Sequence, residues 1–257
     1  MNLDAFIKKQ PNFSIPTTYF KVTSKFSTII SFYNYFKEIF PDLETPVTLN
    51  VFIFNSGGLQ VAHKQFRLVT GESTQISLRE LCAEMEGMVC CVAVPEFNLE
   101  DFARDKIVLR TKVSTGFYVT WFDDSNHVDI MHEWNTVSAG VQPFQTSFLN
   151  YSFLGGVIRP GVILMNTTHT SNREGFAEPL MQLYTMKNGK QLVLQSKSID
   201  PIPPMGTRVI DIYSLFGEAR HFLEQYGTLG LSVSSANLPL PLTIESHESG
   251  DFHIHHG

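Results

Sequence analysis

Short apolar runs separated by turn residues recur along the whole chain. Several of them alternate apolar with polar positions, as a half-buried strand does. Turn signals such as Asn188-Gly189 stand between the runs. The pattern predicts a mainly β protein. The predicted strands are Val51–Phe54, Phe66–Val69, Met88–Val94, Phe117–Phe122, Val162–Met165, Leu180–Tyr184, Gln191–Gln195 and Leu229–Val233.

Only short helices are expected between these strands. Ser77 and Glu80 have the spacing of a capping box, which predicts a helix over Leu81–Met85. A second helix is predicted to end at Gly227, because apolar residues before it fall on one helical face. That face consists of Leu215, Ala219, Phe222, Leu223 and Tyr226. Residues 32–40 fit either a helix or a strand.

The two halves of the chain match each other piece by piece and in the same order. The matches pair Ser31–Tyr35 with Ser147–Tyr151, Val51–Asn55 with Val162–Asn166, and Ile76–Leu81 with Ile210–Leu215. We interpret them as a tandem duplication. The expected fold class is mainly β, with two tandem, diverged β-sandwich-like modules at residues 1–135 and 136–257 and short covering helices.

The connection between the modules is expected at Asn135–Pro143, which is rich in Gly, Ser, Thr and Pro. Because this connection is short, the modules are expected to pack closely. The seam between them is then a favoured place for a ligand.

The composition fits packed sheets and argues against some partners. Hydrophobic residues make up 43 % of the chain and charged residues only 17 %. The net charge of −6 and the lack of a Lys/Arg cluster argue against nucleic acid and against an anionic membrane surface. The first residues lack the order of a signal peptide, and no apolar run reaches the ~18 residues of a membrane span. We therefore expect a soluble, cytoplasmic protein.

Three cysteines give no disulfide framework and no metal motif. Cys90 and Cys91 are adjacent and would point to opposite faces of one strand. Together with Cys82 they are interpreted as small, buried apolar residues.

The richest sets of reactive side chains end each half. Residues 127–134 and 251–256 both alternate His or Asp with apolar residues. If both are strands, the period of two turns Val128, Ile130 and Trp134, or Phe252 and Ile254, inward. The polar residues then look the other way. Ile130 aligns with Ile254 and His132 with His256, so the two strands are expected at equivalent positions.

This arrangement gives a metal-site hypothesis. Imidazole and carboxylate groups two residues apart on one strand face can bind a single divalent ion. His127 and Asp129, with His253 or His255 from the other half, would form a two-His, one-carboxylate set suited to a transition metal. An open position on that ion could activate water or oxygen.

Two structural alternatives compete with the metal site. The same residues suit the polar outer face of edge strands, where charges discourage pairing with another chain. Residues 253–256 also precede only Gly257, so a frayed end is a further alternative.

Other candidate sites are weaker. His169 and 172–174 could line a pocket, and Asp123-Asp124 is expected to be a turn. Four aromatic residues could form a stacking platform for a sugar, although alternating aromatics more often pack a core. They are Tyr118, Trp121, Phe122 and Trp134.

The motifs of nucleophile elbows, phosphate-binding loops and dinucleotide-binding turns are missing from the sequence. The leading hypothesis is a non-catalytic binding or assembly protein that uses the seam between the modules, with an unknown protein or small-molecule ligand and a homo-oligomer as an option. One rival is a metal-dependent enzyme of cupin-like or dioxygenase-like type that binds one divalent transition metal through His127, Asp129, His253 and His255. A third hypothesis is a carbohydrate-binding module.

Overall fold

The computed structural model divides the chain into two compact units, Met1–Val137 and Ser138–Gly257, called unit 1 and unit 2 below. The sequence placed this division two residues earlier. The structure describes residues 1–11, 13–39, 41–42, 44–96, 116–125, 127–133, 135–151, 157–170, 173–247 and 252–256.

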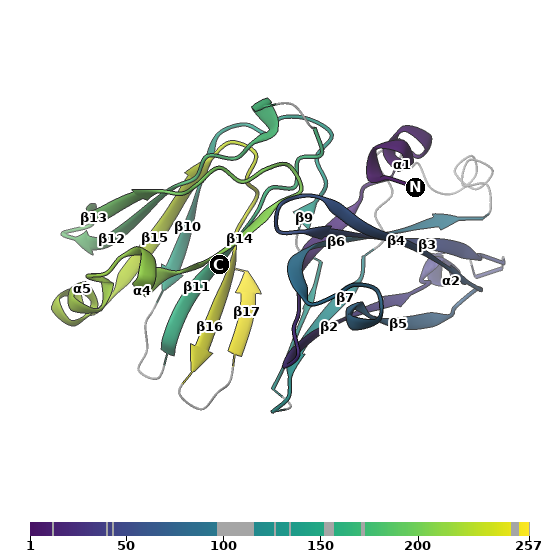
Figure 1. The fold of residues 1–257 in the computed structure, drawn as a ribbon, viewed down its shortest axis with the longest axis horizontal. Coiled ribbons are helices and arrows are strands. Elements are labelled where there is room, and N and C mark those ends of the chain that lie inside the picture. The colour runs from purple at the N-terminus through teal and green to yellow at the C-terminus, as the bar shows by residue number, and fades with distance from the viewer. Residues whose placement is uncertain are drawn as a thin grey trace. The chain divides into compact units, whose positions relative to one another are not determined.

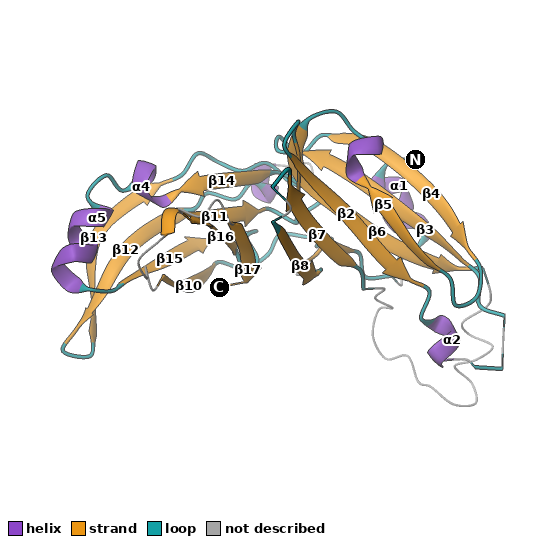
Figure 2. Cartoon of the chain, turned by 90° about the horizontal axis from the view of Figure 1, so that it is seen from below, coloured by secondary structure: helices purple, strands orange, loops and turns teal. Residues whose placement is uncertain are grey.

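Unit 1 is built from two antiparallel sheets (Figures 1 and 2). One sheet has the strand order β4-β3-β6-β1-β9 and the other has the order β5-β2-β7-β8. The strands are β1 (Pro16–Val22), β2 (Phe26–Tyr33), β3 (Val47–Asn55), β4 (Gln60–Leu68), β5 (Ser73–Ser77), β6 (Met85–Pro95), β7 (Tyr118–Asp123), β8 (Val128–His132) and β9 (Asn135–Thr136). The short helices are α1 (Leu3–Lys9), α2 (Phe36–Ile39) and the 3-10 helix η1 (Leu78–Glu80).

Helix α1 packs against the first of these sheets (Figure 2). Asn2 caps its N-terminus, because its side chain accepts a hydrogen bond from the amide of Ala5 at 2.9 Å. The buried ring of Phe6 meets Phe52 of β3 edge to face, with 5.3 Å between the ring centroids. This sheet therefore has apolar contacts on its outer face as well as toward the second sheet.

Unit 2 contains two antiparallel sheets as well, each of four strands. Their strand orders are β10-β15-β12-β13 and β14-β11-β16-β17. Its strands are β10 (Gln145–Tyr151), β11 (Val157–Met165), β12 (Leu180–Lys187), β13 (Lys190–Ser198), β14 (Thr207–Asp211), β15 (Leu229–Ser235), β16 (Leu242–His247) and β17 (Phe252–His256). The helices are η2 (Arg173–Gly175), α4 (Ile212–Leu215) and α5 (Ala219–Tyr226).

The core of unit 2 lies between its two sheets. Leu149, Leu183 and Leu231 come from one sheet, and Val162, Leu164 and Ile210 come from the other. Ile212 and Phe216 extend this cluster to the segment that carries α4. The mainly β, sandwich-like class predicted from the sequence is therefore confirmed.

The helix predictions are partly confirmed. α5 ends at Gly227, whose φ of 76° is the left-handed conformation expected there. The capping-box prediction was wrong in detail, because Leu78–Glu80 forms only one 3-10 turn and Ser77 makes no side-chain cap. In the predicted segment 32–40, β2 ends at Tyr33 and α2 spans Phe36–Ile39, while residue 40 lies outside the described residues.

The two units have the same strand order. If β1–β8 are renumbered as β10–β17, the order β4-β3-β6-β1 becomes β13-β12-β15-β10, and β5-β2-β7-β8 becomes β14-β11-β16-β17. A short helical segment follows both β5 and β14. Only β9, a fifth strand beside β1, has no counterpart in the described part of unit 2.

A buried asparagine occupies the same place in both units, directly after the second strand. Asn34 donates from Nδ2 to the carbonyls of Thr45 (2.6 Å) and Val69 (3.0 Å). Asn166 donates from Nδ2 to the carbonyls of Gly175 (2.7 Å) and Ile202 (2.9 Å). In each unit the two carbonyls belong to the loop before the third strand and the loop after the fourth.

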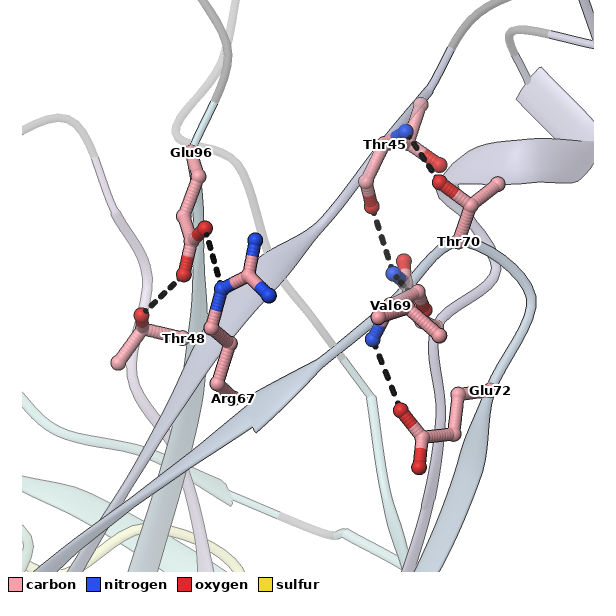
Figure 3. A network of polar contacts seen from close by, with 8 residues as sticks. Thr45, Thr48, Arg67, Val69, Thr70, Glu72 and Glu96 are labelled. Atoms are coloured by element: carbon pink, nitrogen blue, oxygen red, sulfur yellow. Dashed lines mark hydrogen bonds and ion pairs between the residues drawn. The ribbon is translucent and has the colours of Figure 1, made fainter.

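Further polar contacts lie in and near these two loops in unit 1 (Figure 3). The amide of Thr45 donates to Thr70 Oγ1 at 2.6 Å, and the amide of Val69 donates to Glu72 at 2.8 Å. Glu96 binds both Arg67 and Thr48, each at 2.9 Å. The contacts of Glu96 form a group of their own, and the contact between Thr45 and Thr70 joins the two loops that Asn34 also binds.

Two of the three matches read from the sequence were wrong. Ser31–Tyr35 and Val51–Asn55 lie in or just after β2 and β3, whereas their proposed partners lie in or just after β10 and β11, which correspond to β1 and β2. Only Ile76–Leu81 and Ile210–Leu215 fall on equivalent elements. Alternating strands resemble one another in composition, so local matching cannot distinguish neighbouring strands, whereas hydrogen-bond pairing does.

Candidate functional site

The predicted metal ligands of the first half lie at and beside the turn between β7 and β8. His127 Nδ1 is 3.0 Å from Asp123 Oδ2, and the amides of His127 and Ser125 donate to Asp123 Oδ1. Burial by itself raises the pKa of the Asp123 carboxyl, but these hydrogen bonds outweigh it and hold the pKa below its ordinary range. Asp123 therefore organises the turn, as expected for Asp123-Asp124, and occupies one nitrogen of His127.

Asp129 uses its side chain locally as well. Its Oδ1 accepts a hydrogen bond from the amide of Ile130 at 3.0 Å. β8 is the edge strand of its sheet, so such a side chain lies at the rim, where charge discourages pairing with another chain. The edge position agrees with the edge-strand interpretation, but Asp129 is opposite the buried Trp121 and therefore lies on the core side of the sheet, not on its outer face.

The predicted ligands of the second half lie in β17, which is likewise an edge strand. His253 and His255 are exposed, and Phe252 and Ile254 are buried. Ile254 is opposite Ile244, which is opposite Gly161, whereas the core residue Val162 lies in the adjacent row. The burial thus follows the predicted alternation, but these apolar residues do not face the core of unit 2. Thr243 Oγ1 on the neighbouring strand lies 2.9 Å from His255 Nδ1 and 3.0 Å from the His255 carbonyl oxygen.

His127 and Asp129 belong to unit 1, whereas His253 and His255 belong to unit 2. Within the described part of the chain, no group of three or more His, Cys, Asp or Glu side chains is close enough to hold a metal ion. The shared transition-metal site stays a prediction. Trp134 and Asp251, which belonged to the same pattern, lie outside the described residues.

The faces predicted for β8 were wrong. Val128 and Ile130 are 55 % and 61 % exposed, whereas Met131 is buried. Met131 is opposite Val119, and Val119 is opposite Ile30, so this row of buried side chains defines the core side of the sheet. The alternation of the sequence was correct, but its apolar members other than Met131 face outward.

The outer side of this sheet therefore carries an apolar face, which was not predicted from the sequence. Directly opposed strand residues share one face, so the pairing places Tyr118, Val128 and Ile130 together with Tyr33 on the outer side of β5-β2-β7-β8. We call Tyr33, Tyr118, Val128 and Ile130 the β7–β8 face. All four are exposed, with Tyr118 at 60 %.

The alternation of side chains along β7 places the aromatic residues of the predicted sugar platform on two different faces of the sheet. Trp121 is completely buried on the core side, so it packs the sandwich, which was the alternative favoured for alternating aromatic residues. Tyr118 is exposed and Phe122 is half-buried on the outer side. Both remain available to a partner.

Of the other candidates, Asn172 lies outside the described residues, and the backbone groups of His169 and Glu174 make structural hydrogen bonds. Thr168, next to His169, joins a buried network in which its amide donates to Asn166 and its hydroxyl to Asn237. Glu174 lies in η2 and its carbonyl accepts from Asn237. Cys90 and Cys91 are buried in β6, as predicted, Cys82 is half-buried, and all three are free thiols.

Comparison with models of known protein families finds no match for this chain, and comparison with curated protein sequences finds no similar protein. In the described part of the chain, no helix is long and apolar enough to cross a membrane.

Proposed function

We propose that this chain is a non-catalytic binding and assembly protein whose partner, on the β7–β8 face, is a second copy of itself. The observation that supports this proposal is the group of four exposed apolar side chains on one sheet face. Exposed clusters of Tyr, Val and Ile are typical of protein interfaces, where charged side chains are depleted at the centre.

Charge favours a copy of the chain as the partner. The chain has a net charge of −6, so two copies repel each other through most of their surfaces. The rows that contain the β7–β8 face carry Ser31, Thr120 and His132 but no Asp, Glu, Lys or Arg. Glu38, which accepts a hydrogen bond from the Tyr33 hydroxyl at 3.0 Å, lies beside the face. Two copies can meet on the rows formed by β2, β7 and β8 without like-charge contacts, in the two-fold arrangement that is commonest among oligomers.

The area of the β7–β8 face also supports a role as part of a dimer interface. The four side chains leave roughly 400 Å² accessible if their full areas are about 150–250 Å², as for aromatic residues. This is about half of the ~800 Å² that one partner contributes to a standard interface. The half-buried Phe122 and Ile29 lie on the same outer side and extend it.

Light scattering coupled to size exclusion tests this proposal. We expect the wild-type protein to be dimeric at micromolar concentration and Val128→Arg to be monomeric, because the arginine would bury a charge in an apolar contact. Val69→Arg is the matched control, since Val69 is 53 % exposed, close to the 55 % of Val128, but lies in the loop after β4. A monomeric wild-type protein, or equal dissociation by both variants, would contradict the proposal.

We also infer that the two units descend from one duplicated module. The shared strand order and the asparagine at the same topological position support a common origin. Pairing places Ile130 and Ile254 at equivalent positions as well, opposite Thr120 in β7 and Ile244 in β16. The predicted ligand site at the seam between the units stays a prediction.

A further inference from the structure

The outer face of the sheet β10-β15-β12-β13 has an unusual composition. Pairing arranges its side chains in rows across the strands. One row contains Phe148, Ser232, Gln182 and Ser196, the next contains Thr146, Ser234, Leu180 and Ser198, and the third contains Gly230, Tyr184 and Val193. We call these three rows the hydroxyl face. None of these residues is Asp, Glu, Lys or Arg.

Two aromatic rings pack together on this face, with Phe148 exposed and Tyr184 buried at 7 % exposure. Ser232, in the row of Phe148, is buried as well. Phe148 is 56 % exposed and meets Tyr184 edge to face, with 6.2 Å between the ring centroids. The Tyr184 ring lies over Gly230, where a Cβ would overlap it. Glycine at this position therefore lets the tyrosine ring lie across the neighbouring strand toward Phe148.

Neutral polar groups surround the rings. Gln182 Nε2 donates to Ser196 Oγ at 3.2 Å, and the hydroxyls of Thr146 and Ser234 are 2.8 Å apart. Both pairs are exposed at the surface, so each hydroxyl keeps capacity to donate or accept toward a ligand. The pairing holds these groups in defined positions.

The corresponding sheet of unit 1 differs on its outer face. There Phe52 lies beneath Phe6 of α1. In unit 2 the residues 138–144 ahead of β10 form no helix, and the positions on the outer face are mainly Ser, Thr and Gln. Unit 2 thus presents polar groups where unit 1 packs a helix.

We propose that the hydroxyl face binds a neutral glycan. An aromatic ring can stack on the apolar C–H face of a sugar ring, and Ser, Thr and Gln side chains exchange hydrogen bonds with sugar hydroxyls. A face without charged side chains suits an uncharged sugar and offers no pairing for phosphate, sulfate or carboxylate groups. This site is separate from the β7–β8 face, so either proposal can fail without the other.

Titration of the full chain with soluble neutral hexasaccharides of glucose and of mannose, followed by NMR chemical shifts, tests the proposal. We expect saturable shifts for at least one of the two sugars. Phe148→Ala should weaken binding at least ~10-fold by removing the exposed ring. Phe144→Ala is the matched control, because Phe144 is 70 % exposed but lies ahead of β10, and it should bind as the wild type does.

Absence of shifts with both hexasaccharides would overturn the proposal. So would equal binding by Phe148→Ala and the wild-type protein, or binding restricted to sialylated or sulfated glycans added in parallel. If Phe148→Ala does not fold, Gln182→Ala replaces it, because this change removes a partly exposed amide that the proposal requires for sugar hydrogen bonds.

Discussion

Buried thiols illustrate how strongly position controls chemistry at the level of single residues. Burial raises the pKa of the Cys90 thiol to about 12, although its hydrogen bond to Thr17 acts in the opposite direction. Burial also raises the pKa of Cys91 well above its ordinary value. Cys82 is only half-buried, and burial raises its pKa as well. The thiolate is the reactive form, and the raised pKa values disfavour it in all three cysteines. Their different accessibility should therefore decide which thiol reacts first.

We therefore predict that a thiol reagent at neutral pH modifies Cys82 first in the native protein and all three cysteines after denaturation. The measurement is the count of modified thiols against time, with Cys82→Ser as the control that leaves no readily modified thiol. Rapid modification of Cys90 in the folded protein would show that β6 is less protected than its burial indicates.

The two buried asparagines give a second prediction. Asn34→Ala and Asn166→Ala should each lower the free energy of unfolding by about 1–3 kcal/mol, because two loop carbonyls lose their donor. Denaturant titration measures this loss. Asn55→Ala is the control, since the Asn55 side chain accepts a hydrogen bond from the exposed turn amide of Leu59, and a larger loss there would contradict the assigned role.

The alternation of side chains along a strand could be predicted from the sequence, but the side of the strand that faces the core could not. The alternation in β8 was visible, yet it could not tell whether Val128 or Met131 faced the core. The two alternatives differ only in which side of the strand meets the other sheet. That choice depends on pairing with β7, which no local signal encodes.

At the scale of elements, the strongest local signals predicted structure well. Asn188 and Gly189 both have positive φ and join β12 to β13, as the Asn-Gly hairpin signal indicates. Helix α1 was missed because its apolar face is short and its buried Phe6 packs against Phe52, which is distant in the sequence. The β7–β8 face was missed for a similar reason, since its four members are brought together by three strands.

The docking of α1 leads to a prediction for pH. His63 of β4 stacks on Phe52 with 4.4 Å between the ring centroids, and its Nε2 lies 3.1 Å from Asn50 Oδ1. Burial, and then the charge of the N-terminus, lowers the pKa of His63 from its ordinary 6.5. The folded protein therefore binds a proton here less readily than the unfolded chain does.

Because of this difference, protonation of His63 makes the folded protein less stable. The stability that His63 contributes is fully present above about pH 6.5, and it is lost as the pH falls from there through the lowered, folded-state pKa. Denaturant titrations at several pH values should show a shallower decline for His63→Gln than for the wild type in that window. Between pH 7.5 and 8.5 the two proteins should have equal slopes, and an unchanged decline below pH 6.5 in the variant would contradict the prediction.

At the scale of the whole molecule, the shared strand order was predictable in kind but not in detail. The sequence indicated two similar halves, and the two units do share one topology. Two of the three matching segments were nevertheless assigned to the wrong strands. Which strands correspond is decided by pairing partners that are far apart in the sequence. Only the segment from β5 into η1 carried a distinctive signal, since there a strand passes directly into a helical turn.

Self-association through the β7–β8 face predicts a stability that depends on protein concentration. A dimer that unfolds to two chains gains stability by mass action, and monomers do not. With an unfolding enthalpy of ~0.7 kcal/mol per residue, each tenfold rise in concentration should raise Tm by about 1–2 °C. Ile130→Arg should abolish this dependence, whereas Val69→Arg should keep it, because only Ile130 belongs to the face. Differential scanning calorimetry over a hundredfold concentration range makes the measurement, and a constant Tm for the wild-type protein would show that its partner on this face is not another copy of the chain.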